Sequence, residues 1–235
     1  MTLRTRELCA AAVTMDSEKL SCQGNHVTLF RIFMAFMLAA LALSANAQTS
    51  VKPKEFYFDA DATTSRKIVV VQGEGEKLAA DLVKMRERGR KSVEASAQLA
   101  HVALGDGRAA LGKSLYEEAV SATTLSSATG RAIRWNYAWD LYLNGDFAQA
   151  FGLWNELAGG FGQPVWLPST MALSLWSLDR KAEAVQWYAA AVRTEPGLWG
   201  DPANYATLVP DWREQDRRRL GEVFAAWQAA PPAWP

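Results

Sequence analysis

The chain has 235 residues, a formal net charge of zero and 49% apolar residues, a balance typical of a globular protein with a buried core. Zero net charge argues against a nucleic-acid-binding surface, which has to be basic. All ten tryptophans lie between Trp135 and Trp234, so we expect the C-terminal half to form an aromatic-rich packed body.

Residues 1–47 contain the pattern of an export signal. Ile32–Leu43 is a purely apolar run, and Ser44–Ala47 ends in Ala-x-Ala before Gln48. This order is typical of a cleaved secretory signal, whereas twelve helical residues span about 18 Å and fall short of the ~30 Å bilayer core. We predict cleavage after Ala47, a product with no stable membrane anchor, and a periplasmic or secreted location.

The segment before the apolar run has a different character. Residues 1–26 are mixed polar and apolar and would push the run too far inward for an ordinary signal. We therefore expect these residues to be a mis-assigned extension, with translation starting near Val27. Cleavage would remove both cysteines, Cys9 and Cys22, and with them any disulfide or thiolate metal site.

Residues 48–75 are predicted to form a linker and a short β-hairpin. The expected strands are Glu55–Ala60 and Lys67–Val71, both rich in aromatic or β-branched residues. Gly73-Glu74-Gly75 follows the second run, but Leu78 replaces the third glycine of a dinucleotide loop and the two glutamates would repel phosphate. No nucleotide site is expected.

From Glu76 onward the apolar residues recur mostly at spacings of three and four, which indicates helices. Residues 76–130 are predicted as a long helix, with Gly89 and Gly105 as breaks, and a degenerate repeat that includes a helix at Arg108–Ala122. Further helices are predicted at Ala132–Leu143, Phe147–Leu157, Leu167–Leu178 and Lys181–Thr194. In residues 199–235, Trp212–Ala229 is predicted as a capping helix followed by a tail.

Internal similarity is the strongest signal. NGDFAQAFGLWNEL at Asn144–Leu157 and LDRKAEAVQWYAAA at Leu178–Ala191 align without a gap, with Ala150 on Ala184 and Trp154 on Tyr188. Small residues allow paired helices to pack closely, aromatic residues fill the space beyond them, and a proline ends the second unit. The predicted repeat-packing residues are Ala138, Ala150, Trp154, Ala172, Ala184, Tyr188 and Pro196.

The period and residue types resemble the tetratricopeptide repeat (TPR) family. The match covers residues 131–198 as two units. A third unit is plausible at Lys91–Thr124, where Ala110 takes the alanine position but Ser114 and Glu117 depart from the usual aromatic and small residues. The resemblance implies an all-α fold: a superhelical repeat of helix-turn-helix units, here with the small β-hairpin before it and the capping helix after it.

The resemblance also implies a concave groove lined by the first helix of each unit, and a non-catalytic scaffold or adaptor in the cell envelope. The groove residues expected to contact a partner are Trp135, Trp139, Tyr142, Trp166 and Trp176. Some repeat proteins of this type bind a peptide's terminal carboxylate with lysine, arginine and asparagine side chains in the groove. Here Asn136 is the one match and Arg131–Arg180 lacks lysine, so we expect no such carboxylate clamp. The expected ligand is an apolar helix or an extended protein segment.

No catalytic residue, cofactor or metal site is predicted, since His101 is the one histidine that follows the signal. An alternative is an enzyme or binding module that acts on cell-wall glycans, with aromatic stacking on sugars and two carboxylates. A further alternative is that the hairpin adds a strand to a partner's sheet.

Overall fold

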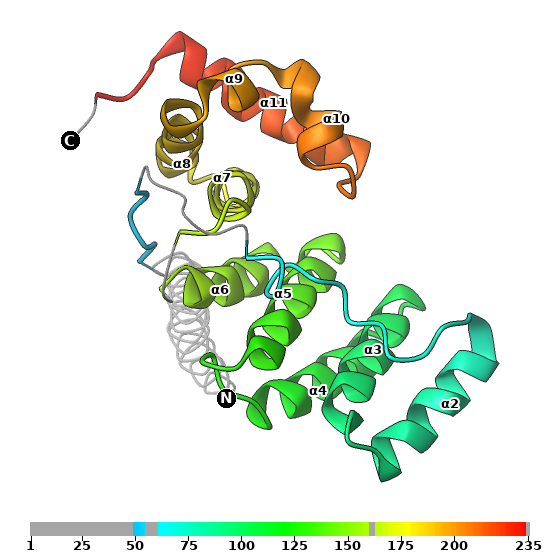
Figure 1. The fold of residues 1–235 in the computed structure, drawn as a ribbon. Helices are drawn as coiled ribbons and strands as arrows, with labels where there is room; N and C mark the ends of the chain where they lie inside the picture. The colour runs from blue at the N-terminus through cyan, green and yellow to red at the C-terminus, as the bar shows by residue number, and fades with distance from the viewer. Residues whose placement is uncertain (1–48, 55–60, 160–162, 234–235) are drawn as a thin grey trace, which may run out of the picture. The chain divides into compact units, whose positions relative to one another are not determined.

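The computed structural model describes residues 49–54, 61–159 and 163–233, and these residues form a helical body (Figure 1). The described ranges contain helices and no strand, which confirms the all-α prediction. The predicted export signal and the first predicted strand lie outside the described residues. No described helix combines the length and the apolar character needed to cross a bilayer.

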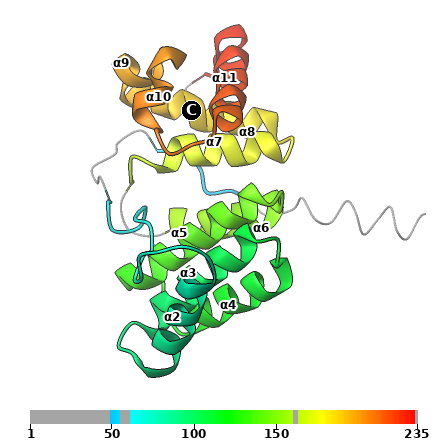
Figure 2. The ribbon, with the colours of Figure 1, turned by 90° about the vertical axis from the view of Figure 1, so that its right-hand side faces the viewer.

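Three helix pairs form the centre of the body, and within each pair the two helices pack on one another (Figures 1 and 2). The pairs are α3 (Ser92–Gly105) with α4 (Ala109–Ser121), α5 (Ala128–Leu143) with α6 (Phe147–Ala158), and α7 (Leu167–Ser177) with α8 (Lys181–Thr194). Neighbouring pairs meet through α5, which contacts both α3 and α4, and through α6, which contacts α7.

The remaining helices flank these pairs. Helix α2 (Gly75–Arg88) packs on α3, and α11 (Glu214–Ala229) packs on α7 and α8. Three short helical turns connect α8 to α11. They are α9 (Pro196–Trp199), η2 (Pro202–Asn204) and α10 (Tyr205–Leu208).

The turn between the two helices has the same geometry in all three pairs. A residue with positive φ follows each first helix: Gly107 at 76°, Gly145 at 88° and Asp179 at 60°. The next residue donates its N–H to the carbonyl five positions earlier, as in Arg108 to Ala103, Asp146 to Leu141 and Arg180 to Leu175. This is the hydrogen bonding of a Schellman helix end.

The shared geometry corrects the alignment expected for the first pair. The interval from Gly107 to Gly145 is longer than the interval from Gly145 to Asp179. Gly112 therefore corresponds to Ala150 and Ala184, in place of the expected Ala110. Tyr116 is the aromatic counterpart of Trp154 and Tyr188, and all three rings are fully buried. The first pair is consequently less degenerate than its sequence indicated.

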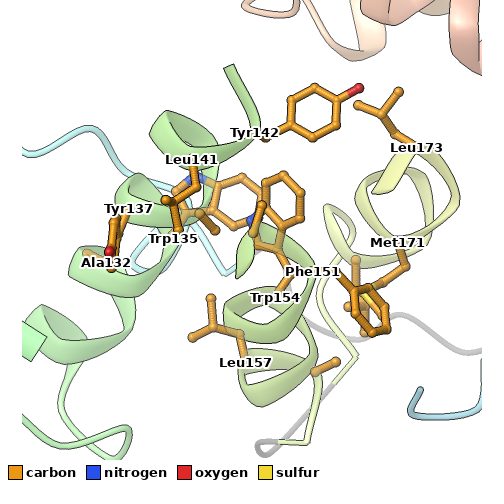
Figure 3. Packing of buried hydrophobic residues seen from close by; sticks show 14 of the residues in the cluster. Ala132, Trp135, Tyr137, Leu141, Tyr142, Phe151, Trp154, Leu157, Met171 and Leu173 are labelled. Carbon is orange, nitrogen blue, oxygen red and sulfur yellow. The ribbon is translucent and has the colours of Figure 1, made fainter. Parts of the chain in front are cut away.

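All but one of the residues predicted to pack the repeat are buried. Ala138, Ala150, Ala172 and Ala184 are all fully buried. Figure 3 shows the centre of this core, where Trp135 and Tyr142 of α5 approach Trp154 of α6, with Met171 and Leu173 contributed by α7. Pro196 is the exception, because it is exposed and begins α9 directly after α8 has ended.

The N-terminal part has one predicted break and one departure from the prediction. The chain is divided at Gly89, where a break was predicted, into α2 and α3. A Cβ at Gly89 would lie 2.9 Å from the carbonyl oxygen of Met85, so glycine fits this break best. Lys67–Val71 was predicted as a strand but is not one; its backbone bonds instead to side chains of α3 and α5.

Candidate functional site

The residues before α2 lie across the first helices of two pairs. We call residues 61–71 the N-terminal strap. Figure 1 shows it in cyan, passing over α5 and α3 before it reaches α2, and Figure 2 shows the same course from the side. Hydrogen bonds from both helices hold its backbone and side chains, and three side chains provide them: Gln98, Arg131 and Asn136. We call these three residues the clamp face.

Asn136 of α5 holds the middle of the strap. Its Nδ2 donates to the carbonyl oxygen of Arg66 at 2.8 Å, and its Oδ1 accepts the N–H of Ile68 at 3.4 Å. The same Nδ2 donates to the carbonyl oxygen of Ala132 within α5, which fixes the orientation of the amide. One side-chain amide thus supplies a donor and an acceptor to residues two apart, as a neighbouring strand would.

Gln98 of α3 holds the end of the strap in a similar way. Its Oε1 accepts the N–H groups of Val70 and Val71 at 2.7 and 3.0 Å, and its Nε2 donates to the carbonyl oxygen of Val71 at 2.7 Å. Gln98 is only 6% exposed. The interval from Gln98 to Asn136 equals the interval between the turn glycines of the first two pairs, so the two amides occupy the same repeat position.

Strap side chains are also buried against this face. Ile68 is 7% exposed and belongs to the main apolar core, and Thr64 is fully buried. The Thr64 hydroxyl accepts a hydrogen bond from Arg131 Nε at 3.1 Å. Partial burial raises the pKa of the Asp61 carboxyl group, but hydrogen bonds from Thr64 and Thr63 outweigh this effect and lower that pKa.

A related clamp lies on α6. Asn155 donates from Nδ2 to the carbonyl oxygen of Thr49 at 3.2 Å and accepts the N–H of Val51 at 2.9 Å. The Ser50 hydroxyl donates to Glu183 of α8 at 2.5 Å. The contact of residues 49–51 lies on the second helices of two pairs, whereas the strap lies on first helices. Asn155 is therefore a suitable control for Asn136, because it is the same kind of residue on a different face.

The five aromatic residues predicted to line a groove are mostly packed among other rings. Tyr142 is fully buried and Trp135 is 9% exposed, whereas Trp139, Trp166 and Trp176 are partly exposed. Trp135 lies 4.6 Å from Trp166 and 5.9 Å from Trp139, measured between ring centroids. The structure therefore brings four of the five together as a packed cluster that also includes Trp154 and Trp212.

Trp176 stands apart from that cluster on α7. Its Nε1 donates to Glu222 of α11 at 2.8 Å, and Lys181 Nζ lies 3.5 Å from the ring centroid. Tyr142 has a comparable role on α5, since its hydroxyl accepts from Arg219 of α11 at 2.7 Å and lies 3.1 Å from the Ser177 hydroxyl. Both side chains thus attach the capping helix to the pairs.

His101 of α3 forms a polar cluster with α4 and α5. Its Nδ1 lies 2.8 Å from Asp140 Oδ1, and the Tyr116 hydroxyl donates to Asp140 Oδ2 at 2.6 Å. The hydrogen bond to Asp140 raises the pKa of His101, although partial desolvation and Lys67 oppose it. Burial and the Asp140 charge raise the pKa of Tyr116 well above its ordinary value, so Tyr116 remains a donor.

This cluster is the nearest approach to a catalytic arrangement, because a carboxylate orients an imidazole in many hydrolases. A general base also needs a proton to abstract within hydrogen-bond reach. In the described part of the chain, His101 bonds only to Asp140. No group of three or more His, Cys, Asp or Glu side chains in the described ranges could hold a metal ion.

Comparison with models of known protein families, with curated proteins and with solved structures finds no match for this chain.

The sequence indicates part of the clamp face and misses the rest. In the sequence, Asn136 stands out as the one match to a carboxylate-clamp residue, but nothing singles out Gln98 or Arg131. The signal for Gln98 is its interval from Asn136, which matches a repeat only when the first unit is aligned on Gly112. With Ala110 in that place, the two amides fall at different repeat positions.

Proposed function

We propose that this chain is a non-catalytic, exported scaffold of the TPR type, which holds an extended segment of another protein against the first helices of its repeats. One observation carries the proposal: two amide side chains at the same position of successive pairs, Gln98 and Asn136, bind the backbone of an extended segment. Repetition of a backbone-binding residue is what recognition of an extended chain requires.

The repeated turns support the TPR-like part of the proposal. Three pairs share one turn geometry, at Gly107, Gly145 and Asp179, and the small residues Ala150 and Ala184 are fully buried at equivalent positions of their helices. We propose that the first helices line the concave side of the repeat, and that the partner is a component of the cell envelope. The partner is bound mainly through its backbone, and the partly exposed aromatic residues lie at the edge of the binding face.

The export part of the proposal concerns the N-terminal end of the chain. The compact unit that contains the repeats extends over Thr49–Pro235, and it begins two residues after the predicted cleavage site at Ala47. A mature protein starting at Gln48 would therefore retain every described helix and the Asn155 contact.

In-cell crosslinking of the full chain tests the proposal, with crosslinked proteins identified by mass spectrometry. We expect a discrete partner with the wild type, and at least about tenfold less of it with Asn136→Ala, because one backbone hydrogen-bond pair is lost and a polar group is left unpaired. Asn155→Ala removes an amide of the same kind from a different face and should leave the partner unchanged.

Equal loss in both variants, or no loss in either, would contradict a partner site on the clamp face. Asn136 is a better choice for this test than Trp139, because the Trp139 ring packs against Trp135, Trp154 and Trp212. Truncating that ring would remove core contacts as well as any partner contact.

A further inference from the structure

The strap occupies the face that we propose binds a partner, so it shows what that face accepts. We infer that the clamp face selects extended partner segments that copy the strap, and that the strap has to leave before such a segment binds. The inference rests on the proposed function and specifies its ligand: a segment with an unpaired backbone and a buried β-branched residue at one fixed position.

Backbone recognition sets the first requirement. The N–H groups of Ile68, Val70 and Val71 donate to clamp-face oxygens, whereas the N–H of Val69 makes no hydrogen bond within the described residues. A segment with proline at any of the three bonded positions would lose a donor and would be rejected. Proline at the unbonded position would be tolerated far better.

Side-chain burial sets the second requirement. Ile68 is 7% exposed, whereas its neighbour Val69 is 50% exposed. The clamp face therefore selects the side chain at position 68 and places little constraint on the side chain at position 69. Lys67 pairs with Asp211 at 3.2 Å, but both side chains are more than 70% exposed, so a basic residue there adds little affinity.

The attachment of the strap allows it to be displaced. Gln72 and Glu74 are exposed, and Gly73 and Gly75 have φ of 136° and 63°, conformations that favour glycine. This short glycine-containing connection joins the strap to α2. Because the strap is tethered, its effective concentration at the face is on the order of millimolar, and a partner segment competes against it.

Fluorescence anisotropy with a labelled synthetic peptide of residues 61–72 tests the inference on the full chain. Wild-type protein retains its strap in place and should bind the peptide weakly. Ile68→Asp puts a charge at the buried strap position, releases the strap, and should strengthen peptide binding at least about tenfold. Adding Asn136→Ala to the released variant should weaken binding by a similar factor.

Two modified peptides form the matched pair. A methyl group on the Val70 nitrogen removes a bonded N–H and should weaken binding to the released variant at least about tenfold, whereas the same methyl group on the Val69 nitrogen should change it less than about threefold. Should circular dichroism show that Ile68→Asp is unfolded, Val70→Pro replaces it, because proline removes a bonded N–H of the strap without burying a charge.

Two results would overturn the inference: a folded released variant that binds the peptide no better than wild type, or equal effects of the two methyl groups. Crosslinking separates this failure from failure of the scaffold proposal. If Asn136→Ala abolishes the cellular partner while the peptide never binds, the face is a partner site with a different ligand. If the peptide binds as expected but no partner is captured, the scaffold proposal fails.

Discussion

At the scale of single residues, equivalent positions of the three helix pairs differ in the size of side chain that fits there. Gly112, Ala150 and Ala184 all lie one turn into the second helix, where their N–H groups bond the carbonyl of the preceding turn residue at 3.0 Å. A Cβ added to Gly112 would lie 2.5 Å from Leu104 Cγ and 2.9 Å from the carbonyl oxygen of Ala100. The first pair is therefore closer at this point than the others.

Gly112→Ala should consequently destabilise the protein even though alanine favours helices. We expect a loss of about 1–3 kcal/mol from overpacking against the backbone of α3. Gly221→Ala is the matched control, because Gly221 lies inside α11 with nothing within 4 Å of its Cβ position. It should stabilise by up to about 1 kcal/mol. Urea unfolding midpoints measure both effects, and a stabilising Gly112→Ala would contradict the packing described.

This position also shows which of the small packing residues could be predicted from the sequence. Ala150 and Ala184 could be predicted from the sequence, because their neighbourhoods resemble each other. The first unit was aligned on Ala110 instead of Gly112, because its connection to the second unit is longer and its small residue is glycine. Sequence similarity alone cannot divide such an insertion between helix and loop.

At the scale of elements, the helices after Gly105 could be predicted from apolar spacing. The helix predicted at Lys181–Thr194 coincides with α8, and the one predicted at Phe147–Leu157 differs from α6 by one residue. The short turns α9, η2 and α10 could not be predicted, because four residues or fewer carry no periodicity. The β-branched run Lys67–Val71 fits a half-buried extended site, which strand propensity does not distinguish from a sheet.

Polar contacts between elements make the stability of the pairs depend on pH. The Asp140 hydrogen bond raises the pKa of His101 above its ordinary value of about 6.5. Protonated His101 therefore stabilises the contact between α3 and α5 at pH values below about 6.5, and this contribution disappears as pH rises through the folded-state pKa. The Tyr116 hydrogen bond to Asp140 remains throughout.

Melting temperatures of wild type and His101→Gln between about pH 5.5 and 8.5 measure this effect. We expect the advantage of the wild type to be greatest at the acidic end and to shrink at the basic end. A difference that stays constant over the range, or one that grows with pH, would mean that His101 has no raised pKa in the folded protein.

At the scale of the whole described unit, the site depends on contacts that no local pattern contains. Gln98 and Asn136 bond strap residues that are 27 to 70 positions away in the sequence. The predicted groove relied on aromatic residues, and four of the five pack in a cluster of rings because each large ring buries more area between helices than on a surface. Backbone recognition by amides carries the site, and the interval between the two amides matches a repeat only when the first pair is aligned on Gly112.

Residue-resolved amide hydrogen exchange on the full chain, followed by NMR, tests the central claim most directly. The docked strap predicts slow exchange at Val70 and fast exchange at Val69, since only the first N–H is bonded. Asn136→Ala and Gln98→Ala should each accelerate exchange within the strap, whereas Asn155→Ala should not. Equally fast, free-chain exchange at Val69 and Val70 in the wild type would show that the strap does not lie on the clamp face.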